Sequence, residues 1–283
     1  MTRRLCCVFA LAAGLALAGC SGVSVLSPGT SELDNAAPAA SGANLASLSD
    51  VVARNPNDPQ AYNMRGSAYG LAGQYKEALD DFNKAISLDA KYAQAYANRG
   101  LVNRATNKFD LALADYNKAL AIDASYAAAY LGRGIVHRQK GQPVQALADF
   151  NKAIAIRPDN AQAYYNRGLL YQGQNQHQFA IDDFATAIAL APQQAEYLVA
   201  RGLSYIAVND PKSATSDLDE ACLADPQSVK AWLTRALAYE RLGDNERAAG
   251  SYARVLHIEK DHEAARTGFK RVGGEYGRQY QTY

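Results

Sequence analysis

The segment AYNMRGSAYG at residues 61–70 decides the fold, because it returns every 34 residues along the chain. Five later copies follow: AYANRGLVNR at 95–104, AYLGRGIVHR at 129–138, AYYNRGLLYQ at 163–172, YLVARGLSYI at 197–206 and AWLTRALAYE at 231–240. A period of this length is typical of a solenoid, in which each supersecondary unit buries its apolar face against its neighbours.

Each unit is expected to be a pair of helices joined by a tight turn. In its second half the apolar residues are three and four apart, as in Phe82, Ala85 and Ile86, which is helical periodicity. Between the halves, one position holds only Gly or Asn, the residue types that tolerate the left-handed conformation after a helix end. These turn residues are Gly73, Asn107, Gly141, Asn175, Asn209 and Gly243.

Small residues recur at two further positions, where helix backbones are expected to approach closely. The first set is Gly66, Gly100, Gly134, Gly168, Gly202 and Ala236, and the second is Ala78, Ala112, Ala146, Ala180, Ala214 and Ala248. Large residues lie beside both sets, and Pro158, Pro192 and Pro226 mark second-helix ends in three units, because proline cannot continue a helix. The other three units have Ala90, Ala124 and Lys260 at that position, so their helix ends are less sharply defined.

This register of bulky, small, aromatic and proline positions resembles the tetratricopeptide repeat family over residues 59–262. The resemblance implies an all-α, right-handed superhelical solenoid of six helix-turn-helix repeats, whose first helices line a concave binding face. Projecting the period outward predicts an N-terminal capping helix within residues 44–58 and a C-terminal capping helix at 263–272, with Phe269 and Val272 inward. Residues 273–283 are expected to be disordered.

The first 19 residues have the features of a bacterial export signal. Arg3 and Arg4 precede an apolar stretch that is too short to span a bilayer, which indicates a signal peptide. The motif Leu17-Ala18-Gly19-Cys20 resembles the lipobox of bacterial lipoproteins and implies acylation of Cys20, with an ordinary secretory signal as the alternative. Ser21 implies the periplasmic face of the outer membrane, and residues 20–43, rich in Ser, Gly, Ala and Pro, predict a flexible tether.

Composition and motifs point away from several classes of function. Without residues 1–19 the chain holds 27 basic and 28 acidic residues, so nucleic acid is not an expected partner. No catalytic constellation, metal-ligand spacing or cofactor motif appears, and an enzyme is not predicted. Cys222 occupies an aliphatic position of the repeat and is expected in the core, with a redox role as the alternative; His137 occupies a tyrosine position and is expected to pack there.

Arginine recurs once in every unit, at Arg65, Arg99, Arg133, Arg167, Arg201 and Arg235. Aspartate recurs on the second helix at Asp81, Asp115, Asp149, Asp183 and Asp217, and the last unit has Ser251 there. We expect each arginine to pair with an aspartate, while a ladder for an acidic partner is the alternative. Pairing with the preceding unit would join Arg235 to Asp217, whereas pairing within the unit would leave Arg235 without an acid.

The concave face implied by the resemblance contains a continuous apolar floor in the middle and later units. It suits an extended peptide or an amphipathic helix. The candidate peptide-binding residues are Leu101, Arg104, Leu131, Ile135, Arg138, Tyr165, Leu169, Gln172, Val199, Leu203, Ile206, Leu233 and Leu237. Asn63 and Ser67 replace the Lys and Asn of chaperone-binding relatives that clamp a C-terminal carboxylate, so that mode is not expected.

Anchor and repeats together resemble the NlpI-type lipoproteins, which act as adaptors between a periplasmic protease and cell-wall hydrolases. The predicted function is therefore a lipid-anchored periplasmic scaffold that binds protein or peptide partners of the cell envelope. A pilotin-like assembly factor for a secretin or pilus pore is the alternative. Two questions stay open at this stage: whether the solenoid forms a homodimer, and whether the Tyr-rich tail fills the groove.

Overall fold

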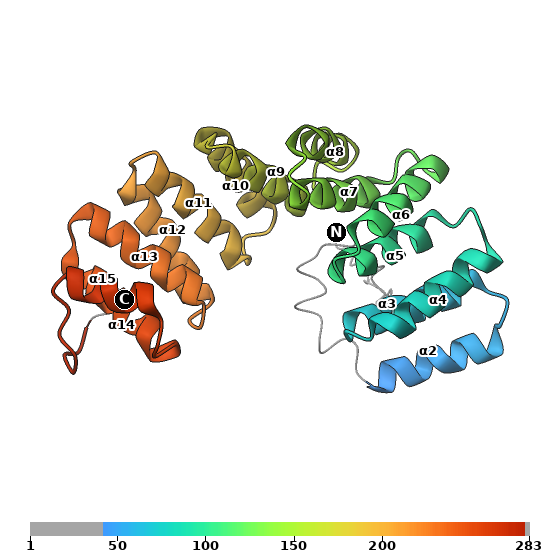
Figure 1. Ribbon diagram of the computed structural model, residues 1–283, viewed down its shortest axis with the longest axis horizontal. Coiled ribbons are helices and arrows are strands. Elements are labelled where there is room, and N and C mark those ends of the chain that lie inside the picture. The colour runs from blue at the N-terminus through green and yellow to red at the C-terminus, as the bar shows by residue number, and fades with distance from the viewer. Residues whose placement is uncertain (1–41, 281–283) are drawn as a thin grey trace, which may run out of the picture.

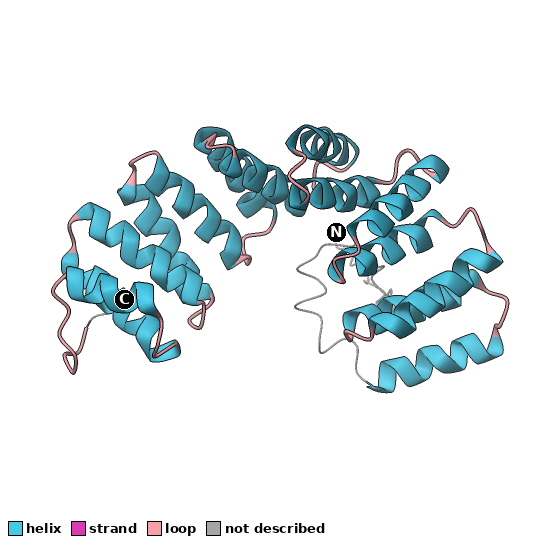
Figure 2. Ribbon diagram, viewed as in Figure 1, coloured by secondary structure: helices cyan, strands magenta, loops and turns pink. Residues whose placement is uncertain are grey.

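The computed structural model describes residues 42–280, which fold into an open arc of helices (Figure 1). Within this range there are helices and loops and no strands (Figure 2). The helices are α2 (Gly42–Arg54), α3 (Pro59–Leu71), α4 (Tyr75–Leu88), α5 (Ala93–Ala105), α6 (Phe109–Ile122), α7 (Ala127–Gln139), α8 (Pro143–Ile156), α9 (Ala161–Gly173), α10 (His177–Leu190), α11 (Ala195–Ala207), α12 (Pro211–Ala224), α13 (Val229–Leu242), α14 (Asn245–Ile258) and α15 (Glu263–Arg271).

Six helix pairs, from α3–α4 to α13–α14, follow one another along the arc and confirm the predicted all-α solenoid. Within the six pairs, each helix packs most extensively against its partner, and each second helix of the first five pairs packs next against the first helix of the following pair. The helix α2 covers the first pair and α15 covers the last, so the two predicted capping helices are present. The signal peptide, Cys20 and the predicted tether up to residue 41 lie outside the described residues.

The two helices of a pair interlock because an aromatic ring occupies the space that a side chain would fill. A Cβ atom on Gly168 of α9 would lie 2.6 Å from Phe184 of α10, and one on Gly134 would lie 2.7 Å from Phe150. Both rings are fully buried. Since protein interiors are close-packed, a methyl group at either glycine would force the ring out of its position.

The turn between the helices of each pair has the predicted conformation. Asn107, Asn175 and Asn209 have φ near 60°, and Gly73, Gly141 and Gly243 also have positive φ. The second helices end at equivalent residues whether or not proline follows. In the first two units the carboxylates of Asp89 and Asp123 accept hydrogen bonds from the backbone N–H groups two residues later, and this local turn ends the helix without proline.

Each recurring arginine pairs with an acid, and those of the second, third, fourth and last repeats also contact the repeat before them. Arg133 donates to both carboxylate oxygens of Asp149, at 2.9 and 2.7 Å, and its remaining amino group donates to Asn117 of the preceding repeat at 2.7 Å. Arg99 and Arg167 have the equivalent two partners, Asp115 with Asn83 and Asp183 with Asn151. The expected pairing with aspartate is therefore within the repeat, and an asparagine accepts from the same guanidinium across the repeat boundary.

The last repeat departs from both alternatives considered for Arg235. Its guanidinium donates to Asp219 of the preceding repeat at 2.6 Å and to Ser251 of its own repeat at 2.7 Å. Asp219 occupies the position that is asparagine in the first three repeats. In the earlier repeats the acid that pairs with the arginine is on the second helix of the same repeat, whereas here it is on the second helix of the preceding repeat. Both positions are within reach because the guanidinium lies between them. Arg235 keeps a counter-charge, contrary to the expectation for within-repeat pairing.

The C-terminal residues 273–280 fold back onto the last capping helix, whereas the sequence predicted a disordered tail from residue 273. Tyr276 and Tyr280 pack against Phe269 with ring centroids 5.1 and 5.8 Å away. Arg278 forms an ion pair with Glu246 of α14 at 3.0 Å. The physical reason for the difference is that α15 has no following repeat, and the two tyrosines cover apolar surface that would otherwise be exposed. Residues 281–283 lie outside the described part.

Replacement of Gly168 by alanine is expected to lower the free energy of unfolding by about 1–3 kcal/mol, because the new methyl group overlaps the buried Phe184 ring. Gly173, the last residue of the same helix, has no atom within 4 Å of its would-be Cβ. Gly173→Ala should therefore stabilise the protein by about 0.5 kcal/mol through the unfolded chain. Urea unfolding followed by circular dichroism measures both, and equal effects of the two changes would contradict the interlock.

Arg133→Leu is expected to destabilise the fold by about 2 kcal/mol, since it leaves the buried carboxylate of Asp149 without its charged donor. Arg157→Leu is the matched control, because Arg157 pairs with Asp159 and both side chains are more than half exposed. The control should change stability by less than about 0.5 kcal/mol. A larger effect on the control than on Arg133 would show that the repeated pair is not structural.

Candidate functional site

The first helices of the repeats form the inner side of the arc. Each first helix from α3 to α11 contacts the first helix of the next repeat, while no comparable contact joins successive second helices in the described chain. In a curved stack the closer row lies on the inside of the bend. The concave face therefore carries the side chains of α3, α5, α7, α9, α11 and α13, as the family resemblance implied.

Burial divides the thirteen predicted groove residues into three classes. Leu131, Ile135 and Val199 are buried, with 1, 5 and 2% of their surface exposed. Leu237 is 38% exposed. The half-buried residues are Leu101, Arg104, Arg138, Tyr165, Leu169, Gln172, Leu203, Ile206 and Leu233. The sequence interpretation placed Leu131, Ile135 and Val199 in the groove floor, and the structure corrects this. Their side chains belong to the cores between helices.

The accessible apolar surface of the concave face consists of Leu101, Leu169, Leu203, Ile206, Leu233 and Leu237, here called the apolar floor. Tyr165 lies beside it, with its ring centroid 4.6 Å from that of Tyr197 and 5.8 Å from that of Phe184. Burial raises the pKa of the Tyr165 hydroxyl to about 12, so it is a neutral donor at physiological pH. The arrangement offers apolar contacts with fixed hydrogen-bonding groups at their edges.

A row of polar side chains crosses between successive first helices, and the sequence interpretation did not identify it. Asn98 donates to the side-chain oxygen of Asn63 at 3.0 Å, and both residues are buried. Farther along, the Gln172 amide donates to the Ala200 carbonyl at 3.0 Å and to the Ser204 hydroxyl at 2.8 Å. The repeated Asn-Arg dipeptides at 98–99 and 166–167 were the available signal for part of this row.

Arg104 and Arg138 lie on the concave side of consecutive repeats, on α5 and α7, and neither forms an ion pair with any residue between 42 and 280. Arg138 donates to the Asn166 side-chain oxygen at 3.3 Å, and Arg104 lies beside the Tyr116 hydroxyl. The Nε atoms of both arginines are buried without a hydrogen-bond partner. Burial lowers the pKa of Arg138, and the nearby positive charge of Arg104 lowers it further.

Other chemistry-bearing residues are part of the packing. Cys222 is a free, fully buried thiol in the core of the last repeats, and burial raises its pKa to about 12, as expected for a core residue. His137 contacts Gln142 at 2.7 Å and lies 3.9 Å from Asp149. The described residues contain no group of three metal-binding side chains and no helix long and apolar enough to cross a membrane.

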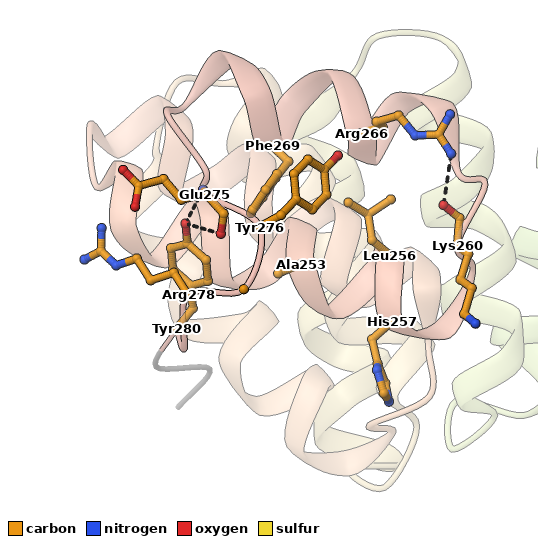
Figure 3. A pocket seen from close by; sticks show the side chains of 11 residues that line it. Ala253, Leu256, His257, Lys260, Arg266, Phe269, Glu275, Tyr276, Arg278 and Tyr280 are labelled. Carbon is orange, nitrogen blue, oxygen red and sulfur yellow. Dashed lines mark hydrogen bonds between the residues drawn. The ribbon is translucent and has the colours of Figure 1, made fainter.

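A hollow of about 390 Å³ lies at the C-terminal end of the solenoid and not on the concave face (Figure 3). Leu256 and His257 of α14, Phe269 of α15, and Tyr276 and Tyr280 line it. The tail closes on itself here, with the Glu275 backbone N–H donating to the Tyr280 hydroxyl at 2.6 Å. The described part of the Tyr-rich tail therefore covers the end of the solenoid and leaves the groove open.

Comparison with protein families decides the identity of the fold. Models described as TPR repeat match residues 103–141 and 136–175, and models described as tetratricopeptide repeat match residues 59–92, 161–194 and 199–266. The chain belongs to the tetratricopeptide repeat family. Proteins of this family are in general protein–protein interaction scaffolds. No curated protein matches the sequence of this tetratricopeptide repeat protein.

Three solved structures illustrate its place in the family. A chain of the APC/C hetero-tetramer Cut9-Hcn1 has a TM-score of 0.73 at 19% identity, over 85% of this chain but only 48% of that one. The Pseudomonas aeruginosa pilF structure has a TM-score of 0.68 at 19% identity, over 75% of this chain and 97% of that one. YrrB, described as a TPR protein with an unusual peptide-binding site, has a TM-score of 0.57 at 26% identity, over 67% and 97%.

Proposed function

We propose that this protein is a lipid-anchored scaffold of the bacterial periplasm, which binds extended or helical segments of envelope proteins in its concave groove. The observation that carries the proposal is the apolar floor, a set of partly exposed aliphatic side chains on the first helices α5, α9, α11 and α13. Scattered apolar residues are common on protein surfaces, but contiguous apolar surface edged by polar groups is typical of interaction sites. Peptide binding by YrrB, a relative at 26% identity, supports the same use of the fold.

The geometry favours a segment that runs along several repeats. The second and fourth repeats each add one apolar side chain to the floor and the fifth and sixth each add two, so affinity would accumulate over the length of the partner. Most of these side chains are half-buried in the free protein and therefore held in place before binding. Side chains that are already ordered lose little conformational entropy when the partner arrives, which strengthens binding for a given contact area.

The anchor part of the proposal rests on the sequence around Cys20. The Leu-Ala-Gly-Cys motif supports acylation there, and the Ser21 residue that follows supports the outer membrane. A chain of about twenty residues between Cys20 and α2 would let the solenoid reach partners away from the membrane surface. This placement would bring the groove to envelope enzymes that act on the cell wall or on other envelope proteins.

Loss of the apolar floor should abolish partner recovery. We expect Leu203→Gln with Leu237→Gln to retain the fold, because both side chains are partly exposed and Gln keeps a similar length. In affinity recovery from solubilised envelopes, this variant should lose partners at least tenfold relative to the unmodified protein. Leu111→Gln with Val144→Gln is the matched control, since these side chains lie on second helices and are 56 and 78% exposed.

Equal losses in the two double variants, or none in the floor variant, would reject groove binding. The identity of the recovered proteins separates two roles: cell-wall hydrolases or proteases support the adaptor, and subunits of a secretin or pilus pore support the assembly factor. Circular dichroism of each variant, compared with the unmodified protein, establishes that the helices are intact.

Acylation is tested separately. Cells that express the full chain and grow with an alkynyl fatty acid should yield a labelled protein in the outer-membrane fraction, and Cys20→Ala should remove both the label and the membrane association. Cys222→Ala is the control and should keep both, because Cys222 is buried in the core. Label that persists in Cys20→Ala would exclude the proposed attachment site. If the protein is labelled but does not fractionate with the outer membrane, acylation of Cys20 stands and the proposed outer-membrane location is excluded.

A further inference from the structure

Two cations in the middle of the groove have no counter-charge within the described residues, and each keeps a buried Nε–H without an acceptor. Both occupy one position of the repeat, which is Gly70, Arg104, Arg138, Gln172, Ile206 and Glu240 in the six repeats. Gln172 is satisfied by the backbone and hydroxyl of α11, and Glu240 accepts from Arg271 at 2.9 Å and from Tyr252 at 2.8 Å. Arg104 and Arg138, here called the groove arginines, have no acid in the equivalent place.

The local sequence explains why Arg104 finds no partner on the next first helix. The polar members of this position reach residues about thirty positions ahead, on the next first helix: Gln172 reaches Ala200 and Ser204, and Arg138 reaches Asn166. The residue at the corresponding distance from Arg104 is Gly132, which has no side chain. The Tyr116 ring fills that space, with its hydroxyl 2.6 Å from where a Gly132 Cβ would lie.

An unpaired cation in a half-buried site is unfavourable in the free protein. Desolvation weakens the charged state, and a second positive charge within Coulomb range weakens it again, as the lowered pKa of Arg138 records. Both groove arginines also keep a buried Nε–H without an acceptor. A carboxylate placed between them would supply the missing acceptor and the missing negative charge together, and charge-assisted hydrogen bonds of this kind are the strong ones.

We propose that the groove arginines recognise an aspartate or glutamate side chain in the partner segment. This inference rests on the proposed peptide-binding function and specifies the chemistry of the partner: an extended segment with one acidic residue between apolar residues. An internal acid fits better than a terminal carboxylate, because apolar floor lies on both sides of the arginines. Leu101 lies one repeat before Arg138, and Leu169 lies one repeat after it. A partner chain can therefore continue in both directions from the acid.

The arginines of this site differ from those that recur in every repeat. Arg99 and Arg133 are each held by an aspartate and an asparagine within the fold, and their charge is already neutralised. The groove arginines are thus available to a ligand, whereas the recurring arginines are part of the structure.

Selection from a random dodecapeptide library displayed on phage tests the proposal. Peptides fused at their C-terminus have no free terminal carboxylate, so only a side-chain acid can satisfy the site. Selection on the unmodified protein should enrich Asp or Glu at one position between apolar residues. Selection on Arg104→Gln with Arg138→Gln should lose the acid and keep the apolar residues. Lys152→Gln with Arg157→Gln removes two positive charges from exposed positions outside the groove and should retain the acid.

Synthetic copies of a selected peptide give the decisive comparison. A Glu→Gln exchange in the peptide should weaken binding to the unmodified protein about tenfold, and should have little effect on binding to the groove arginine variant. Two results would overturn this inference and leave the proposed groove function intact. One is selection of apolar peptides without enrichment of Asp or Glu. The other is a Glu→Gln exchange in the peptide that weakens binding equally to the unmodified protein and to the groove arginine variant. Absence of any selected peptide would overturn both the inference and the groove function.

Thermal unfolding separates recognition from a structural role. The double glutamine variant should melt within about 2 °C of the unmodified protein or above it, because it removes two charges that the fold does not neutralise. A fall of more than about 4 °C would assign the arginines to the stability of the stack and overturn the proposal. The exposed double variant serves here as the reference for loss of positive charge alone.

Discussion

The close approach of two helices over a residue without a side chain is the constraint on which this solenoid depends. In four consecutive repeats an aromatic ring of the second helix lies directly on a glycine of the first, and in three of them, at Gly66, Gly134 and Gly168, the distance leaves no room for a methyl group. The pair of helices is thereby fixed in angle and spacing, and each fixed pair presents the same surface to the next. Because every repeat buries its apolar face only against neighbours, the geometry of this one contact is copied along the chain and sets the curvature of the arc.

Charge interactions secure the boundaries between those copies. A guanidinium that contacts its own aspartate and the asparagine of the preceding repeat belongs to two units at once. The same guanidinium also lies over an aromatic ring of its own helix, as for Arg99 over Tyr96 and Arg133 over Tyr130, with the guanidinium carbon 5.5 Å from each ring centroid. The last repeat shows that the constraint is on the site and not on any one acid: Asp219 substitutes from the other side where Ser251 has replaced aspartate. The groove arginines have no such counter-charge within the described residues, and there we infer that an acidic side chain of a partner supplies it.

The periodic features could be predicted from the sequence, and the features that escaped prediction are aperiodic. Helix pairs, turn residues such as Asn107, the capping helices and the burial of Cys222 all follow from superimposing the repeats. The exposure of individual groove residues does not, because Ile135 and Leu169 occupy the same repeat position yet only Ile135 is fully buried. The difference arises from the residues opposite them in the next repeat, which a pattern within one repeat does not contain. The packing of the tail against Phe269 likewise depends on contacts that occur once.

The folded tail has a consequence for how copies of this protein can meet. A solenoid ends in surfaces that resemble its internal boundaries, so an uncovered end invites another molecule to add itself as the next unit. Here Tyr276 and Tyr280 occupy the apolar surface of α15, and Arg278 ties the tail to Glu246. A second molecule would have to displace these contacts before it could stack on that end. The folded tail thus opposes the stacking of a second copy on the C-terminal end of the solenoid.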